Sequence, residues 1–371
     1  MPDIINQHFH CVIMAGGIGS RFWPLSNTET PKQFIDILGI GATLIQQTYD
    51  RFKGYIPDEN FWVVTSEQYK DKILEQLPEI PFSNILTEPI RRNTAACIAY
   101  ATWRINLKDK DAVMAVTPAD HVVFKKDVFE QTMRNALTYS YQNTVLLTIG
   151  LSPTFPATGY GYIQRGVWAG NVCTGDVDDV VYKVESFREK PDEHTAEEFI
   201  KQGNFFWNSG IFVWSVSSIQ KAFRTYLPDI AGAFDKGADV YGTSGEKEFI
   251  RDIYKTIQSI SVDYGIMEQS DNTGVICADM GWSDLGTWQS LYQLSDKDEN
   301  GNHINAGKSL VTDSGNNIIR VCDKDKKVVI SGLDGYIIVD TGDVIMICPA
   351  GDEKNITKLM EKALTEFDKP V

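Results

Sequence analysis

The loop that follows the first apolar run of the sequence is rich in glycine and ends in a cation; it contains Gly16, Gly17, Gly19 and Arg21. Glycine tolerates positive φ and has no Cβ, so backbone N–H groups in such a loop can approach phosphate oxygens closely. A second cation, Lys32, follows in the same connection. The loop does not match a dinucleotide fingerprint, because a phenylalanine replaces its last glycine, and no Lys-Ser or Lys-Thr pair makes it a Walker A loop. It predicts a phosphate site, with an ordinary strand-to-helix turn as the alternative.

Two aspartates lie far apart in the sequence, each beside the end of a predicted element. Asp120 follows an apolar strand candidate through Pro118, and open α/β sheets bind ligands at the carboxyl ends of such strands. Asp284 lies between glycines, just before a predicted helix. Taken alone, Asp120 could serve only its own loop, and Asp284 or Ser283 could cap the helix. We expect His121, which follows Asp120, to form structural hydrogen bonds.

Four other segments combine polar side chains with glycine or aromatic residues. Asn93 and Thr94 open an apolar helix and resemble a helix cap. A glutamate beside a lysine is usually a surface ion pair, and aromatic residues usually belong to a core. The residue types alone therefore do not identify a ligand for the other three segments. Their candidate residues are Gly159, Glu189, Lys190 and Asn208.

The composition restricts the classes of function. The 371 residues carry a formal net charge of −15, whereas binding to nucleic-acid phosphates requires a basic face, so we expect no nucleic-acid partner. An acidic protein that binds nucleotides must concentrate its few relevant cations at one site, usually with a divalent metal. We see no secretion signal, and no apolar run approaches the ~18 residues of a membrane span. The six scattered cysteines include no C-x-x-C pair, which favours reduced thiols and a cytoplasmic location.

The elements that must position these residues alternate between β-like runs and helical patterns over the first ~290 residues, which predicts an α/β fold with a mainly parallel sheet. We expect strands at residues 10–15, 61–65, 84–87, 112–117, 145–150, 181–187, 210–214 and 274–278. We expect helices at residues 43–52, 68–77, 94–106, 128–141, 196–202 and 287–294.

The pattern changes after residue 295. A polar linker at residues 296–302 is followed by short runs of high β propensity, separated by turn sequences. We therefore predict two domains, a catalytic domain at 1–295 and a small β-rich, β-helix-like module at 296–371. The strands of the module are expected at residues 309–312, 317–321, 327–331, 336–339 and 344–348, and a final helix at 354–367.

The residues around the glycine loop resemble a known signature. Residues 16–21, Gly-Gly-Ile-Gly-Ser-Arg, are followed by Phe-Trp-Pro-Leu-Ser at 22–26 and by Pro-Lys-Gln-Phe at 31–34. This series is similar to the signature of the sugar-1-phosphate nucleotidylyltransferases, in the form of the mannose-1-phosphate guanylyltransferases. The resemblance continues motif by motif through nearly the whole chain. It implies a Rossmann-like nucleotidyltransferase domain with a mixed, mainly parallel sheet.

The resemblance also implies roles for the residues described above. Asp120 and Asp284 match the carboxylates that hold a catalytic Mg²⁺. Arg21, Lys32 and the loop amides of Gly16, Gly17 and Gly19 would hold the β- and γ-phosphates of the nucleotide. The base side of the nucleotide site would include Asn93, Thr94 and Pro118. The hexose and its phosphate would bind Gly159, Glu189, Lys190 and Asn208, and catalysis would depend on Arg21, Lys32, Asp120, Lys190 and Asp284.

The reaction implied by the resemblance is transfer of GMP from GTP to α-D-mannose 1-phosphate, which gives GDP-mannose and pyrophosphate, in a cytoplasmic homodimer. The attacking phosphate oxygen is already anionic, so no general base is required. Two alternatives remain. The same chemistry could act on another sugar 1-phosphate or another nucleoside triphosphate, or the chain could be a non-catalytic paralogue that senses nucleotide sugars.

Two departures from relatives affect these expectations. The segment at residues 263–268 resembles a family stretch that often continues with lysine, and Gln269 stands at that position, so no cationic role is expected there. Asp263 and Glu268 are expected mainly to shape the wall of the sugar pocket. Bifunctional relatives continue into an isomerase domain. Since this sequence ends at Val371, we do not expect isomerase activity.

Overall fold

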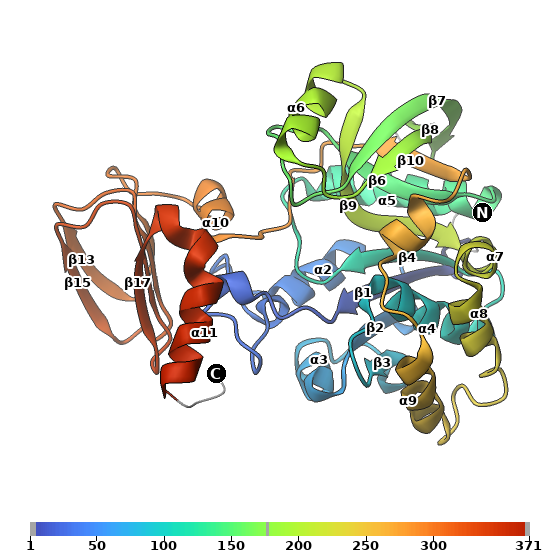
Figure 1. Ribbon diagram of the computed structural model, residues 1–371, viewed down its shortest axis with the longest axis horizontal. Helices are drawn as coiled ribbons and strands as arrows, with labels where there is room; N and C mark the ends of the chain where they lie inside the picture. The colour runs from blue at the N-terminus through green and yellow to red at the C-terminus, as the bar shows by residue number, and fades with distance from the viewer. Residues whose placement is uncertain (1–4, 176–177, 368–371) are drawn as a thin grey trace. The chain divides into compact units, whose positions relative to one another are not determined.

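The computed structural model describes residues 5–175 and 178–367, which form two compact units (Figure 1). Neither unit is continuous in sequence. The first comprises Met1–Gly16, Thr48–Ala119 and Val123–Trp282, and the second comprises Gly17–Gln47, Asp120–Val122 and Ser283–Val371. Most of the glycine loop therefore belongs to the same unit as the C-terminal residues. The domain boundary expected after residue 295 stays a prediction.

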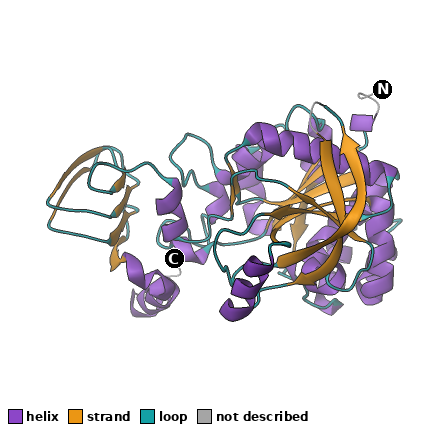
Figure 2. Cartoon of the chain, turned by 90° about the horizontal axis from the view of Figure 1, so that it is seen from above, coloured by secondary structure: helices purple, strands orange, loops and turns teal. Residues whose placement is uncertain are grey.

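A mixed nine-stranded sheet forms the centre of the first unit (Figure 2). Four of its strands are parallel and adjacent in the order β3-β2-β1-β4. Their residues are almost all buried and apolar, as expected for parallel strands that are covered on both faces. Because the strands are parallel, their carboxyl ends lie at the same edge of the sheet. The strands are β1 (Phe9–Ala15), β2 (Phe61–Ser66), β3 (Ile85–Glu88) and β4 (Val113–Pro118).

The other half of this sheet is mainly antiparallel. β9 (Phe205–Ser215) lies antiparallel between β4 and β6 (Leu146–Leu151), and β10 (Thr273–Cys277) pairs in parallel with β6. A long pair, β7 (Tyr162–Cys173) and β8 (Asp178–Arg188), completes the sheet and is visible in green in Figure 1. The sequence did not indicate β7, because most of its residues are at least partly exposed and lack the apolar run of a buried strand. The expected α/β class with a mixed sheet is confirmed.

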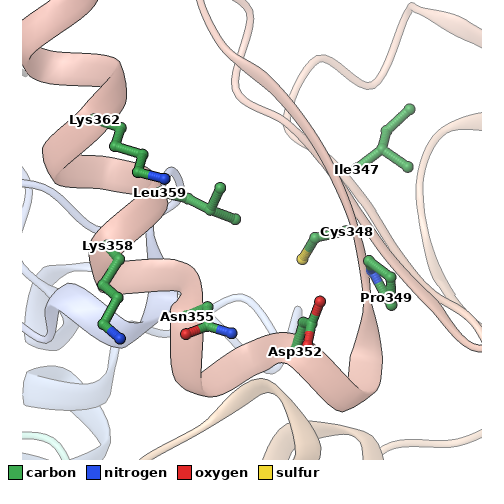
Figure 3. A pocket seen from close by; sticks show the side chains of 8 residues that line it. All are labelled: Ile347, Cys348, Pro349, Asp352, Asn355, Lys358, Leu359 and Lys362. Carbon is green, nitrogen blue, oxygen red and sulfur yellow. The ribbon is translucent and has the colours of Figure 1, made fainter.

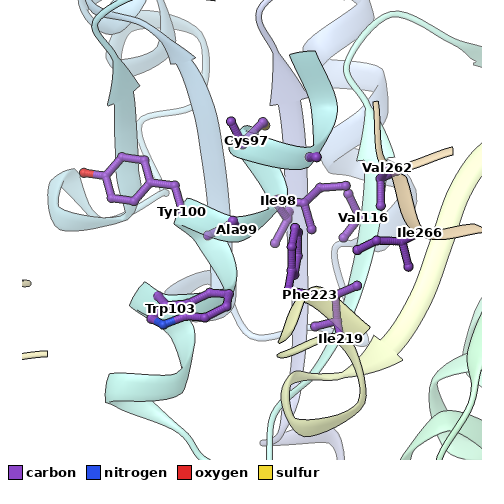
Figure 4. Packing of buried hydrophobic residues seen from close by; sticks show 14 of the residues in the cluster. Cys97, Ile98, Ala99, Tyr100, Trp103, Val116, Ile219, Phe223, Val262 and Ile266 are labelled. Carbon is purple, nitrogen blue, oxygen red and sulfur yellow. The ribbon is translucent and has the colours of Figure 1, made fainter. Parts of the chain in front are cut away.

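Helix α4 (Asn93–Lys108) lies at the centre of the main apolar core. Its first half is rich in alanine, which has the highest helix propensity, and these small side chains are buried. Figure 4 shows Ile98 and Trp103 of this helix beside Phe223. The other helices of the unit are α3 (Lys70–Gln76), α5 (Lys126–Gln142), α6 (Glu193–Gln202), α7 (Val216–Tyr226), α8 (Pro228–Asp235) and α9 (Glu246–Thr256).

Short elements connect these strands and helices. Three of the helices, α7, α8 and α9, were not expected from the sequence. A π-helical turn, η6, spans Asp263–Met267. Within α2 (Leu44–Phe52) the chain passes from the second unit, which includes Gln47, to the first, which includes Thr48. None of the described helices has both the length and the apolar character needed to cross a membrane. The remaining short elements are η3 (Asp58–Asn60), η4 (Glu67–Tyr69), η5 (Phe82–Asn84), β5 (Val122–Val123) and β11 (Trp282–Ser283).

Short parallel strands stack in the C-terminal part of the second unit. β12 (His303–Asn305), β14 (Ile318–Val321) and β16 (Tyr336–Asp340) pair in parallel, as do β13 (Lys308–Thr312) and β15 (Lys327–Ser331). A buried amide links successive turns of this coil, because Asn317 Nδ2 donates to Asn302 Oδ1 at 2.9 Å. The predicted β-rich, coil-like region at the C-terminal end is confirmed. It is completed by β17 (Ile345–Pro349), antiparallel to β16, and by η7 (Ala350–Asn355) and α11 (Ile356–Phe367).

The segment that follows the glycine loop packs in the core of this second unit. Phe22 is fully buried, and its ring centroid lies 5.0 Å from that of Trp288. The same cluster includes Ile337 and Ile356 from the C-terminal elements. Burial of these side chains fixes the segment that carries the predicted phosphate-binding cations. The short helices here are η1 (Ser20–Phe22), η2 (Lys32–Phe34) and α10 (Trp288–Leu294).

Candidate active site

The glycine loop is folded tightly around the backbone of Lys32. Gly19 has φ of 72°, and a Cβ added there would collide with the Cβ of Lys32. Three carbonyl groups of the loop accept hydrogen bonds: Ile18 O from the amide of Lys32 at 3.1 Å, Gly17 O from the side chain of Gln33 at 3.0 Å, and Gly19 O from Ser26 Oγ at 2.5 Å. The loop therefore requires glycine at position 19 for both its backbone conformation and its close packing.

The amide groups of the same loop are left available. Within the part of the chain that the structure describes, the N–H groups of Gly17, Ile18 and Gly19 donate no hydrogen bond. These residues are partly or fully exposed, so water can solvate their amides when no ligand is bound. Successive N–H groups without internal acceptors are the usual backbone feature of a phosphate site. The geometry thus supports anion binding and disfavours an ordinary turn.

Lys32 connects the two predicted metal ligands. Its ammonium lies 2.9 Å from Asp120 Oδ2 and donates to the backbone carbonyl of Asp284 at 2.7 Å. The side chain of Lys32 is only 5% exposed, whereas that of Asp120 is 34% exposed. Burial would raise the pKa of Asp120, but the charges of Lys32 and His121 outweigh it and hold the pKa below its ordinary value. Asp120 therefore remains an anion at neutral pH.

Asp284 lies in a turn that also contacts the other predicted cation. Its Oδ1 accepts the amide of Gly286 at 3.1 Å, and Arg21 Nη1 donates to the carbonyl of Gly286 at 3.4 Å. Helix α10 is capped by Thr287 in a reciprocal capping box with Ser290, so the alternative of a helix cap at Asp284 or Ser283 is wrong. The second unit thus contains Arg21, Lys32, Asp120 and Asp284 in one connected set.

This donor set is compatible with Mg²⁺. The ion commonly binds one or two protein carboxylates and completes its shell with water and substrate phosphates. Asp120 and Asp284 supply two carboxylates, and among the described residues there is no group of three or more acidic, histidine or cysteine side chains that would form a complete protein site. His121 Nε2 lies 3.9 Å from Asp120 Oδ1, beside the carboxylate.

A second polar cluster lies in the first unit and contains the predicted sugar-binding residues. Asn208 Nδ2 donates to Asp263 Oδ1 at 2.9 Å, and the amide of Glu189 donates to Glu268 Oε1 at 3.0 Å. Burial and the neighbouring charge of Glu189 raise the pKa of Asp263 to about 6. Asp263 and Glu268 therefore hold Asn208 and the backbone of Glu189 in place.

Lys190 is the cation of this cluster. Its Nζ lies 2.9 Å from Glu189 Oε1, and the hydrogen bond between them raises the pKa of Lys190. The backbone of Lys190 has φ of 46°, a conformation that residues other than glycine rarely adopt. Its side chain is 58% exposed. Such backbone strain at an exposed cation is typical of a ligand site. The structure thus brings Glu189, Lys190 and Asn208 together.

The loop that contains Gly159 is held by aromatic side chains. The ring of Tyr160 lies 5.2 Å from that of Trp207 and 5.4 Å from that of Trp282. Gly159 itself has open space where a Cβ would lie. The sequence indicated the glycines of this loop, but it gave no sign that Tyr160 and Trp282 anchor it, because their contact joins residues far apart in the chain.

The predicted base-binding residues differ from the expected helix cap. The structure has no side-chain cap at the start of α4, and Asn93 accepts the amide of its neighbour Thr94 at 2.8 Å with φ of 65°. Thr94 Oγ1 instead accepts the amide of Val262 at 2.9 Å, and Ile260 O accepts the amide of Ala95 at 3.2 Å. The predicted cap is wrong, because tertiary contacts take the place of local ones. The amides of Thr94 and Ala95, at the start of α4, therefore both donate hydrogen bonds within the protein.

Glu88 is a candidate residue that the sequence analysis did not single out. It ends β3, is buried, and accepts the hydroxyl of Tyr254 through Oε1 at 3.0 Å. Its other oxygen lies 3.7 Å from the position of a Cβ at Gly16. Burial raises the pKa of Glu88 to about 7. The signal in the sequence that could have identified Glu88 is an acidic residue at the end of a predicted parallel strand.

A surface cavity of about 510 Å³ lies elsewhere in the second unit, between β17 and α11 (Figure 3). It is lined by apolar side chains such as Ile347 and Leu359 and by Lys358 and Lys362. None of the predicted site residues contributes to it. This cavity is therefore not part of the predicted phosphate-binding or sugar-binding cluster.

The chain is similar to known proteins over most of its length. The sequence model of the nucleotidyl transferase family matches residues 10–301. A protein of Klebsiella pneumoniae named mannose-1-phosphate guanylyltransferase is 35% identical over 94% of this chain and 73% of its own length. One of the same name from Sinorhizobium fredii is 32% identical over 98% of this chain and 68% of its own length.

Solved structures show the same similarity. The crystal structure named mannose-1-phosphate geranyltransferase from Thermus thermophilus has a TM-score of 0.83 and 27% identity, over 96% of this chain and 99% of that one. A mannose-6-phosphate isomerase from Helicobacter pylori shares the fold with a TM-score of 0.59 and 24% identity, over 74% of this chain and 99% of that one.

Proposed function

Because the chain belongs to the nucleotidyl transferase family and, within it, to the mannose-1-phosphate guanylyltransferases, we propose that it transfers GMP from GTP to α-D-mannose 1-phosphate, with release of pyrophosphate. The observation that carries the proposal is the connected set in the second unit, in which unpaired loop amides, two cations and two carboxylates occur together. Amides and cations suit the phosphates of a nucleotide, and the carboxylates suit a divalent metal.

The attacking group of this reaction is a phosphate oxygen that is already anionic. Catalysis therefore consists of bringing two polyanions together and stabilising charge on the α-phosphorus and on the leaving pyrophosphate. The amides of Gly17 and Gly19 and the guanidinium of Arg21 would bind the β- and γ-phosphates, and Gly16 would begin this loop. Asp120 and Asp284 would hold Mg²⁺, which when bound supplies Lewis-acid stabilisation of the phosphoryl oxygens.

The cluster of the first unit would bind the sugar phosphate. Lys190 would pair with the phosphate, since its side chain is exposed and its charge is maintained by Glu189. Glu189 and Asn208 would form hydrogen bonds with the hexose hydroxyls, and the carboxylate of Glu189 would be an acceptor. Gly159 would donate from its backbone amide. On the base side of the nucleotide, Asn93, Thr94 and Pro118 would line the pocket. We further propose a cytoplasmic location and a homodimer.

The assay that tests this proposal measures pyrophosphate release from each of several nucleoside triphosphates with each of several hexose 1-phosphates. We expect turnover to be highest with GTP and mannose 1-phosphate and to require a divalent cation. Higher turnover with another pair would assign the same chemistry to other substrates. Binding of GDP-mannose without turnover of any pair would instead identify a non-catalytic sensor and overturn the proposal.

A further inference from the structure

Lys32 occupies an unusual position for a phosphate-binding lysine. Its side chain is almost fully buried, and its ammonium is already bound by the carboxylate of Asp120 and the carbonyl of Asp284. A buried ammonium is costly unless it is paired and hydrogen-bonded, so the conformation of Lys32 depends on these two partners. The residue expected to bind phosphate is therefore engaged with the residues expected to bind the metal.

The same carboxylate oxygen cannot serve both cations equally. Asp120 Oδ2 is the acceptor of the Lys32 ammonium, and a divalent ion on this carboxylate would lie only a few ångströms from a like charge. Lysine carries a compact charge on a flexible four-carbon chain, which can take up another position when its partner is lost. Arg21 differs, because it is exposed and, among the described residues, its side chain donates one hydrogen bond, to the backbone carbonyl Gly286 O, and forms no ion pair.

We propose that Lys32 is the resident counter-cation of Asp120, that the divalent metal displaces it, and that displacement releases its ammonium to the phosphates of the nucleotide. This inference rests on the proposed function, since it assumes that Asp120 holds the metal. Metal binding and phosphate binding are then coupled, and by linkage each increases the affinity for the other. Without metal, Lys32 stays on Asp120 and the loop amides and Arg21 alone face the phosphates.

The first test measures Mn²⁺ binding without nucleotide by electron paramagnetic resonance, in the full-length wild type and two variants. Lys32→Met removes the competing ammonium, and we expect Mn²⁺ to bind about 10- to 100-fold more tightly, as for loss of one charge-assisted hydrogen bond. Arg21→Met is the matched control, because it removes the same charge from the same cluster without contacting Asp120. We expect it to change Mn²⁺ affinity by less than about threefold, the effect of an exposed charge.

A second measurement uses the wild type and does not depend on how a variant folds. The rate at which acetic anhydride modifies Lys32, followed by peptide mass spectrometry, reports the exposure of its ammonium. Because Lys32 is buried against Asp120, we expect saturating Mn²⁺ to raise this rate several-fold in the wild type if the metal displaces the ammonium. The rate for exposed Lys358 should stay constant, which excludes a general effect of the metal on the reagent.

The outcomes separate this inference from the proposed function. Equal Mn²⁺ affinities for Lys32→Met and Arg21→Met, or an unchanged modification rate of Lys32 at saturating Mn²⁺, would overturn the displacement. Formation of GDP-mannose by a wild type that binds no Mn²⁺ would also overturn it and would leave the transfer reaction standing. If no substrate pair is turned over while Mn²⁺ still displaces Lys32, the proposed reaction fails and the displacement is supported.

Discussion

Replacement of Glu88 by glutamine should stabilise the protein at alkaline pH and have little effect at acidic pH. Glu88 is buried beside Gly16, and among the described residues its side chain accepts one hydrogen bond, from the hydroxyl of Tyr254, which can donate equally well to a glutamine carbonyl. The variant therefore preserves the packing and removes the titrating group. Its effect on stability depends on the protonation of Glu88 in the native protein.

The sign follows from proton linkage. Burial raises the pKa of Glu88 from 4.5 to about 7, so the native state binds more protons than the unfolded state between these two values. The stability of the wild type accordingly falls as pH rises through this window, and the fall is complete above the native pKa. At 1.36 kcal/mol per pKa unit, the upper bound on the loss is about 3 kcal/mol. Glutamine does not titrate, so the variant lacks this decrease.

Urea unfolding followed by tryptophan fluorescence, at pH 4.5 and at pH 8, measures the effect. We expect Glu88→Gln to exceed the wild type in free energy of unfolding by about 1–3 kcal/mol at pH 8 and to match it within about 0.5 kcal/mol at pH 4.5. Glu75→Gln, on the exposed side of α3, serves as the control and should show no such dependence on pH. An equal difference between Glu88→Gln and wild type at both pH values would refute the burial of an ionised carboxylate as the cause.

Four further substitutions address the phosphate and sugar clusters. Asp120→Asn and Asp284→Asn should each lower kcat for pyrophosphate release by at least ~10², as for loss of an electrostatic stabiliser, and near-wild-type turnover in either would contradict the metal assignment. Lys190→Met should raise KM for the sugar phosphate about 10- to 100-fold with a small effect on KM for GTP, which steady-state kinetics with each substrate varied in turn will show. Gly19→Ala should lower the affinity for GTP in a binding titration at least about 10-fold, because an L-residue at φ of 72° is strained and its Cβ meets Lys32; unchanged affinity would show that the loop amides are not positioned by this turn.

The sequence predicted the parallel half of the sheet better than the antiparallel half. β1, β2 and β4 are mostly apolar and buried, and they can be recognised without knowledge of their neighbours. Most residues of β7 are at least partly exposed and follow no simple alternation, and the register of β7 with β8 shifts at several points. Its existence depends on pairing with distant strands, which periodicity does not reveal.

The same distinction holds for the candidate site. The glycine loop, Lys32 and Asp120 follow local motifs, and the expected residues are indeed close together in one unit. The sequence pattern predicts a helix cap at Thr94, yet its hydroxyl accepts a hydrogen bond from the amide of Val262, which is far away in the sequence. Glu88 was missed because a single carboxylate has meaning only once its burial is known. The roles of Thr94 and Glu88 thus depend on contacts with distant parts of the chain, which the local sequence does not reveal.

The turn from Asp284 to Gly286 connects these observations. Its backbone carbonyls bind both predicted phosphate-side cations, Lys32 through Asp284 O and Arg21 through Gly286 O. A carbonyl is a dipole without net charge, so it can orient a cation while leaving most of its charge available to a ligand. Arg21 forms no ion pair within the described residues, whereas Lys32 is paired with Asp120. In a protein with a net charge of −15, this arrangement would give the phosphates one cation that is available at once and, under the proposed displacement, a second that becomes available only when Asp120 gains another partner.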